Sequence, residues 1–109
     1  MTPLAQTLAK ASANLDANQE AARAFDATYR FVLAGAEGGI YMLTLTNTEV
    51  SLREHDGEAD CSLNLHADDL VALLEGRATA QQLFFSGKLG VTGNLGLAVR
   101  LSQVVKLLA

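Results

Sequence analysis

The stretch from residue 84 to residue 101 constrains the fold more than any other part of this sequence, because four of the nine glycines fall within it. It reads F-F-S-G-K-L-G-V-T-G-N-L-G-L-A-V-R-L, and it lacks the Gly-Lys-Ser/Thr of a phosphate-binding loop. Glycine at this density indicates sharp changes of chain direction, since it adopts left-handed backbone conformations at little cost. The pattern predicts a helix end, a short strand, a tight turn and a second helix.

Local signals support each part of that prediction. Gly87 comes after an apolar helix end, where glycine commonly terminates helices. Leu89 and Val91 alternate with other residues as in a half-buried strand. Gly93 permits the turn, and Asn94 is a good N-cap for the second helix. Apolar residues then recur at helical spacing to the C-terminus: Leu97, Leu101, Val104, Val105 and Leu108.

Upstream, four segments are predicted to be strands: three alternate along the chain, and the segment from Ile40 to Thr46 is apolar with β-branched threonines, so both of its faces can be buried. They begin near Tyr29, Ile40, Val50 and Cys61. Turn signals separate them at Glu37-Gly38-Gly39, Asn47-Thr48 and Asp56-Gly57. Short turns join antiparallel strands, whose sheets have one wet and one dry face, and the dry face needs a cover of helices. The sequence therefore predicts an α+β fold, with a five-stranded, mainly antiparallel sheet covered on one face by helices.

Residues 1–26 are expected to form an N-terminal helical segment of a single domain that spans residues 1–109. After Pro3, apolar residues recur at helical spacing: Leu4, Leu8, Ala11 and Leu15. A break comes next, and a second short helix is expected over 19–26. The favoured interpretation is that the stripe packs on the domain. The alternatives are a homodimer contact or a lid that touches membranes.

The charge pattern excludes several classes of partner. The net charge is −4, and the eight Lys and Arg residues are scattered without a run. Nucleic-acid binding requires a basic patch, which is not visible in the sequence. The single cysteine excludes an internal disulfide, and the apolar runs are far shorter than a membrane span. A cytoplasmic location is the resulting expectation.

The chain offers few residues suited to catalysis. Cys61 falls on the apolar side of its strand, where a cysteine acts as a small hydrophobe, and His66 suits the N-cap of an acidic helix start. His55 lies beside the Asp-Gly turn and is expected in solvent. Four carboxylates alternate around this turn, where a hairpin would spread them into water: Glu54, Asp56, Glu58 and Asp60. We therefore predict no enzymatic activity, no cofactor and no metal site.

The space between the sheet and its helices is the remaining candidate for function. Lipid pockets are mostly apolar with a few polar groups, and half of this chain is hydrophobic while only 6% is aromatic. The predicted ligand-binding residues are Phe31, Leu33, Ile40, Met42, Leu63, Phe84, Phe85, Leu97 and Leu101. The same residues would equally suit a filled, dry core, and composition alone does not distinguish the two.

Four motifs, taken together, resemble a known family. S-G-K-L-x-V-x-G-N-x-G-L-A-x-x-L covers residues 86–101, and A-D-C-S-L-N-L covers residues 59–65. H-A-D-D-L-V-A-L-L-E-G covers residues 66–76, and G-G-I-Y covers residues 38–41. In this order they resemble the lipid-binding domain of the sterol carrier protein 2 (SCP2) family, and the chain is similar to a stand-alone bacterial member.

The resemblance implies an apolar tunnel between sheet and helices and a non-enzymatic, intracellular carrier. Its ligand would be a fatty acid, phospholipid, sterol-like lipid or quinone, with transient membrane contact. The alternative is a non-catalytic interaction or dimerisation module that supports lipid or quinone biosynthesis. Tyr41 stands where many members carry Trp, while Arg100 and Ser102 replace the usual Lys and Gln. These departures affect the expected polar end of the tunnel and hence sterol specificity.

Overall fold

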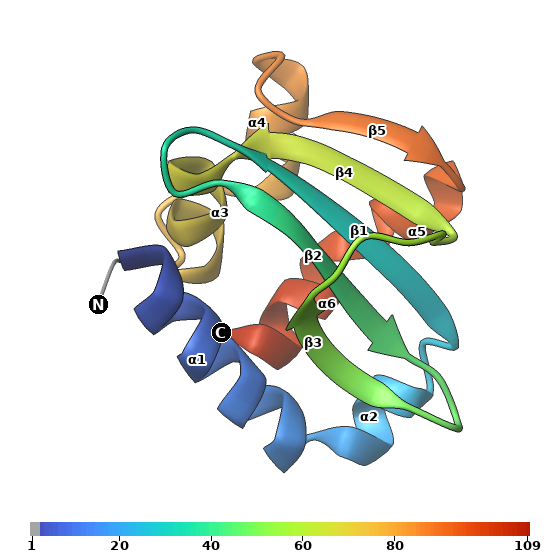
Figure 1. Cartoon of the computed structure of the whole chain (residues 1–109). Helices are drawn as coiled ribbons and strands as arrows, with labels where there is room; N and C mark the ends of the chain where they lie inside the picture. The colour runs from blue at the N-terminus through green and yellow to red at the C-terminus, as the bar shows by residue number, and fades with distance from the viewer. Residues whose placement is uncertain (1–2) are drawn as a thin grey trace.

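A computed structural model describes residues 3–109, which form six helices and five strands (Figure 1). The helices are α1 Pro3–Ala17, α2 Gln19–Arg23, α3 Ala67–Leu74, α4 Ala80–Phe85, α5 Leu95–Val99 and α6 Leu101–Leu108. The strands are β1 Ala27–Ala34, β2 Gly39–Leu45, β3 Val50–Glu54, β4 Cys61–His66 and β5 Gly90–Gly93. Among these residues, no helix combines the length and apolar character that a membrane span needs.

The strands form one sheet in the order β3-β2-β1-β4-β5. The pair β1–β4 is parallel and the other three pairs are antiparallel. Helices pack behind the sheet in the view of Figure 1, while α1 lies along the β3 side and contacts α3 and α6. The predicted α+β fold with a five-stranded, mainly antiparallel sheet is confirmed.

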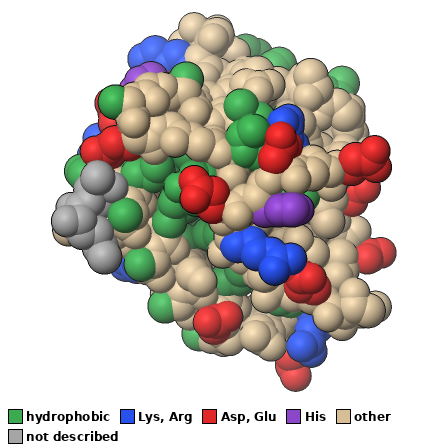
Figure 2. Space-filling model, in the orientation of Figure 1, with side chains coloured by type: hydrophobic (Ala, Val, Ile, Leu, Met, Phe, Trp, Pro, Cys, Tyr) green, Lys and Arg blue, Asp and Glu red, His purple; other side chains and the backbone are tan. Residues whose placement is uncertain are grey.

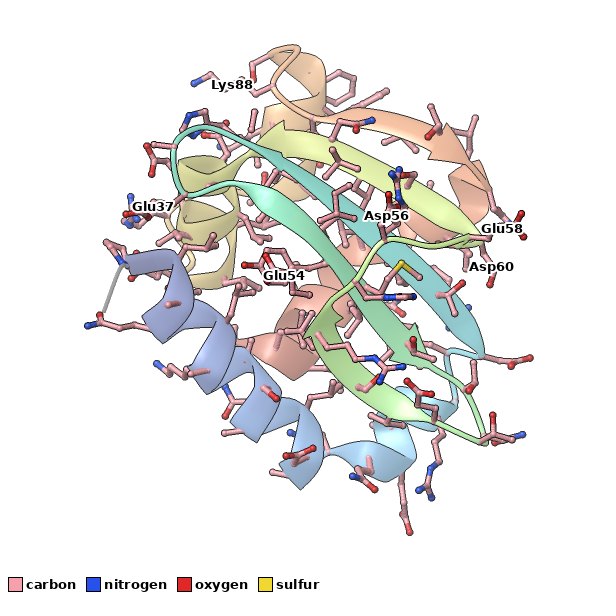
Figure 3. All side chains as sticks on the ribbon, in the orientation of Figure 1. Glu37, Glu54, Asp56, Glu58, Asp60 and Lys88 are labelled. Carbon is pink, nitrogen blue, oxygen red and sulfur yellow. The ribbon has the colours of Figure 1, made fainter. Side chains whose placement is uncertain are left out.

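The predicted hairpin at Asp56-Gly57 is wrong. Strand β3 pairs with β2, whereas β4 pairs with β1 and β5, so residues 55–60 form a crossover instead of a hairpin. This segment passes in front of the sheet in Figures 1 and 3, over the face opposite the helices. Arg30 Nε on β1 donates to Asp56 Oδ1 at 2.9 Å and holds the crossover in place. An Asp-Gly pair favours a turn, but it does not decide which strand edge the chain pairs with afterwards.

The hydrophobic core lies between the sheet and the helices. Alternate residues of β1 face it, among them Tyr29, Phe31 and Leu33, all of which are buried. The stripe of α1 faces the same core, with Leu4 and Leu15 almost fully buried. The N-terminal stripe therefore packs on the domain, and none of the large apolar side chains of residues 3–17 is exposed.

Two glycines and an asparagine set the path of the chain around β5. Gly87 and Gly93 adopt φ values of +78° and +93°, as a helix end and a sharp turn require. A Cβ atom on Gly93 would lie 2.6 Å from the Asp60 carbonyl oxygen, so the turn has no room for a side chain. The Asn94 side chain accepts from Leu97 N–H at 3.3 Å and caps α5, as predicted. The expected single C-terminal helix is divided at Arg100 into α5 and α6.

Candidate functional site

A groove of about 700 Å³ opens at the edge of the sheet between α4, β5 and the α5–α6 pair. This volume lies within the ~300–1,000 Å³ usual for small-molecule sites. The lining residues are Thr79, Ala80, Gln81, Phe84, Leu89, Val91, Leu95, Ala98, Val99 and Ser102. The groove is thus built almost entirely from the glycine-containing part of the sequence and the helix before it.

Each wall of the groove is fixed by a local feature. Thr79 is the N-cap of α4. Its hydroxyl oxygen accepts a hydrogen bond from the Gln82 N–H at 3.1 Å, and the side-chain amide oxygen of Gln82 accepts one from the Thr79 N–H at 3.1 Å. Strand β5 pairs with β4 so that Val91 lies opposite Leu63, on the face that the helices cover. The capping box and the β4–β5 pairing thus fix the start of α4 and strand β5, which are two of the walls of the groove.

The apolar side chains of this site are unusually exposed. Phe84 is 51% exposed, Phe85 79%, Leu95 65% and Val99 80%, and they are the large hydrophobic residues exposed within residues 3–109. Three of them line the groove, and the rings of Phe84 and Phe85 lie 5.9 Å apart. Exposed apolar residues that gather around a concave surface, instead of being scattered singly, mark a binding site.

The polar lining is sparse and carries no formal charge. Thr79, Gln81 and Ser102 contribute hydroxyl and amide groups, and the remaining lining side chains are hydrocarbon. Such a surface binds apolar molecules through water exclusion and dispersion contacts. It can also hydrogen-bond one or two polar atoms of a ligand.

Tyr29 positions the α5 wall from inside the core. Its hydroxyl donates to the Leu97 carbonyl oxygen at 2.8 Å, and its ring stacks on Phe31 with centroids 6.5 Å apart. Burial raises the pKa of Tyr29 to about 12, and Cys61 adds to this effect while Arg100 opposes it. The phenol therefore remains a neutral hydrogen-bond donor across the physiological pH range.

The nine predicted ligand-binding residues are divided between the groove, its walls and the buried interior. Phe84 lines the groove and Phe85 lies beside it, whereas Leu97 and Leu101 lie on the helices that form its wall. Four others are buried and do not line the groove: Phe31, Leu33, Met42 and Leu63. The structure brings one of the nine directly into the groove lining.

Ile40 and Met42 lie on the opposite sheet face from the groove and the core. Met42 is paired with Arg30 and Ile40 with Val32, and these partners alternate with the inward residues of β1. The continuous apolar run of β2 conceals this alternation, because a strand shows its two faces clearly only when one of them is polar.

Four of the nine groove residues that the sequence reasoning missed share one signal. They form a second stripe at helical spacing, on a different helix face from the stripe that contains Leu97: Leu95, Ala98, Val99 and Ser102. A helical segment that is apolar on two faces needs two apolar partners or leaves one face uncovered. Here the core takes one face and the groove takes the other.

The residues with reactive side chains lie away from the groove. Cys61 is buried, and burial together with the Asp60 carboxylate raises the pKa of its thiol. His66 Nδ1 accepts the Asp68 N–H at 3.1 Å, which confirms its predicted role as the N-cap of α3. Within residues 3–109, no three His, Cys, Asp or Glu side chains gather as metal ligands do.

An α+β domain with an uncharged apolar groove at its sheet edge defines a class of small-molecule-binding protein. A sequence profile of the SCP-2 sterol transfer family matches residues 5–106. The match covers nearly the whole chain, and the chain belongs to this family.

Individual relatives agree with the assignment. The chain is 33% identical over 106 residues to hydroxysteroid dehydrogenase-like protein 2 of Xenopus tropicalis, which covers 95% of this chain and 25% of that protein. The chain spans a quarter or less of the hydroxysteroid dehydrogenase-like relatives that it matches.

Two solved structures superpose closely on the fold. The apo form of sterol carrier protein 2 from Yarrowia lipolytica gives a TM-score of 0.78 at 26% identity, over 93% of this chain and 88% of that one. Sterol carrier protein 2 of Aedes aegypti, in complex with palmitate, gives 0.79 at 23% identity, over 100% and 99% of the two chains. The second similarity establishes the fold alone.

Proposed function

We propose that this chain is a non-enzymatic lipid carrier that holds an acyl, sterol-like or isoprenoid chain in the groove between α4, β5 and α5. The observation that carries the proposal is the exposed apolar lining, formed by Phe84, Leu95 and Val99 around a concave surface without charged side chains. In a folded protein, apolar side chains are normally shielded from water by contacts with other apolar groups. These three side chains gain such contacts only when a ligand covers them.

The available free energy is sufficient for a reversible carrier. Burying ~400 Å² of apolar ligand surface contributes roughly 10 kcal/mol at about 25 cal/mol/Å². Loss of ligand freedom returns several kcal/mol of this. The resulting affinity is about micromolar, since ~8 kcal/mol corresponds to a Kd of about 1 μM. A ligand bound this strongly can also be released to another acceptor.

The comparisons support the same ligand class. The Aedes aegypti relative is a complex with the C16 fatty acid palmitate, and the matched family is a sterol transfer family. In this chain, the groove covered by its bound ligand would correspond to the apolar tunnel that the family resemblance implies. Thr79, Gln81 and Ser102 would then hydrogen-bond the polar end of the lipid.

A non-catalytic role fits the reactive groups. A nucleophilic cysteine needs a lowered pKa and access to substrate, whereas Cys61 is buried with a raised pKa. The imidazole of His66 is engaged at a helix N-cap instead of facing the groove. The groove thus offers a binding surface without an attacking group.

Ala98→Trp tests the proposal, because an indole at this position of the lining would occupy the groove. We expect palmitate binding, measured with radiolabelled palmitate at equilibrium, to weaken by about tenfold or more, equal to at least ~1.4 kcal/mol. Ala9→Trp on the exposed side of α1 is the matched control and is expected to bind normally. Normal palmitate binding by a folded Ala98→Trp protein would refute the groove as the lipid site.

Leu101→Trp and Phe85→Trp would be less informative tests than Ala98→Trp. Leu101 is 1% exposed and packs in the core, so a larger residue there would disturb folding as well as binding. Phe85 lies outside the groove lining and points to solvent. Ala98 avoids both problems, since it is half-buried and faces the site.

A further inference from the structure

The charges of this chain are separated along the sequence. The last acidic residue is Glu75, so residues 76–109 contain Arg77, Lys88, Arg100 and Lys106 but no carboxylate side chain. Residues 1–75 contain all twelve acidic and four basic residues, a net −8 against +4 for the remainder. The overall negative charge therefore conceals a cationic third of the chain.

The cationic third is also the part that builds the groove. It forms α4, β5, α5 and α6, which supply every lining residue of the groove except two in the same segment: Thr79, the N-cap of α4, and Leu89, on the connection between α4 and β5. Phe84, Phe85, Leu95 and Val99, the exposed large apolar residues of the described chain, all belong to it. We call these four side chains the rim.

Two cations lie close in sequence to the rim: Lys88 follows the two phenylalanines, and Arg100 directly follows Val99. Lys88 lies on the connection between α4 and β5 (Figure 3), and in sequence it comes three residues after Phe85 and next to the lining residue Leu89. Within residues 3–109 it takes part in no ion pair, whereas Arg77 is paired with Glu75 at 2.6 Å. The Arg100 guanidinium instead lies 4.8 Å from the ring centre of Phe25. Lys88 is thus free to meet an anion outside the protein.

The other surfaces are less suited to an anionic partner. The strand face in Figure 2 carries acidic and basic side chains mixed together, and Arg30 and Arg53 on it are neutralised by Asp56 and Glu49. Helix α1 buries its large apolar side chains in the core. Among the described residues, only the rim combines exposed large apolar side chains with a stretch of sequence that has no carboxylates.

We propose that the rim and Lys88 dock the open side of the groove onto a membrane that contains anionic phospholipid. The apolar side chains of the rim enter the interface, and the cationic segment is attracted to the negative headgroups. The acidic remainder of the chain is repelled by the same headgroups, so the protein is oriented with its groove toward the lipid. The proposal rests on the proposed function only in taking the groove as the lipid site.

Vesicle binding tests this docking surface. Sedimentation is measured with vesicles of phosphatidylcholine alone and with vesicles containing 30% phosphatidylglycerol, about a third anionic lipid. We expect tighter binding to the anionic vesicles and a loss of this preference in high salt, which screens charges beyond ~3 Å at 1 M. We expect Phe85→Ser to weaken binding about five- to tenfold, because an inserted ring is lost.

Charge reversal supplies the matched pair. Lys88→Glu is expected to weaken binding to anionic vesicles by about fivefold or more. Lys10→Glu makes the same change of net charge on an exposed residue of α1 and is expected to have little effect. Equal losses in the two variants would overturn the proposal, since they would indicate a response to net charge alone. A protein that ignores lipid composition, or that covers its rim by forming dimers in sedimentation analysis, would also overturn it.

Palmitate binding without vesicles separates this result from the proposed function. Lys88 does not line the groove, so Lys88→Glu is expected to bind palmitate normally. Normal palmitate binding with no vesicle preference would refute docking and leave the carrier intact. Vesicle preference without palmitate binding would refute the carrier and leave the docking surface.

Discussion

Helices α1 and α5 use the same kinds of apolar residue in opposite ways. On α1, Leu4 and Leu15 are packed against the core and are almost completely shielded from water. On α5, Leu95 and Val99 are among the most exposed large apolar residues of the described chain, and no residue of the helix is fully buried. The first helix stabilises the fold, whereas the second leaves its apolar surface available.

This difference shows that α5 leaves apolar surface exposed to water that would stabilise the fold if it were buried. A single core cannot cover two apolar faces of one helix, so the face of α5 that contains Leu95 and Val99 remains uncovered. Uncovered apolar surface favours aggregation. The exposure of this face is therefore explained most simply by a ligand or a membrane that covers it. The contrast between the two helices yields three predictions about stability and binding.

The largest effect is expected on the buried side of the comparison. Leu15→Ala would leave a cavity between α1 and the core, because Leu15 is fully buried. We expect the free energy of unfolding to fall by about 3 kcal/mol, within the ~2–5 kcal/mol usual for such a change. Urea denaturation followed by circular dichroism measures it. A loss below about 1 kcal/mol would show that α1 is not part of the cooperative core.

A smaller effect is expected at the contact that holds α5. Tyr29 has a folded-state pKa of about 12, above its ordinary value of 10. The contribution of the neutral Tyr29 phenol to the free energy of unfolding is therefore fully present below pH 10 and is lost as the pH rises through 12. Between these values the unfolded state releases the phenol proton, whereas the folded state keeps it. The free energy of unfolding should fall by up to about 1.4 kcal/mol per pH unit in this window.

Tyr29→Phe isolates that contribution. The variant loses the hydrogen bond to the Leu97 carbonyl, at a cost of about 1 kcal/mol at neutral pH, although Arg100 N–H still donates to this oxygen at 3.1 Å. Its stability should depend less on pH between 10 and 12 than that of the parent. Identical alkaline slopes in urea titrations of the two proteins would show that Tyr29 is not held as a buried neutral phenol.

The smallest effect on stability is expected on the exposed side. Val99→Ser should change the free energy of unfolding by less than about 0.5 kcal/mol, because the side chain makes few contacts within the chain. Palmitate binding should nevertheless weaken, since Val99 lines the groove. The same urea titration and palmitate assay measure both quantities. A large loss of stability would place Val99 in the core and remove the contrast with Leu15.

The sequence predicts most of the fold because short-range signals specify most of it. The alternation in β1 and β4, the stripe of α1 and the caps at His66 and Asn94 all appear as expected. The crossover at residues 55–60 was missed because the pairing of β1 with β4 is decided by long-range packing. The local Asp56-Gly57 pair carries no information about it.

The site was less predictable than the fold. Apolar residues were expected to face the ligand, but Phe31 and Leu63 are buried in the hydrophobic core and Met42 lies on the other side of the sheet. Binding residues of this kind differ from core residues in their exposure, and exposure depends on which partners the tertiary structure supplies. The second stripe on α5, with Leu95 and Val99, was the one local signal available.

The most direct test of the account is a methyl NMR titration of the protein with palmitate. We predict that the methyl resonances of Leu89, Leu95 and Val99 shift together, while those of Leu15 and Leu43 in the closed core remain in place. This result would locate the lipid in the groove. Shifts confined to Leu15 and Leu43, or no shifts at saturating palmitate, would contradict the claim that the exposed apolar face of α5 is the binding site.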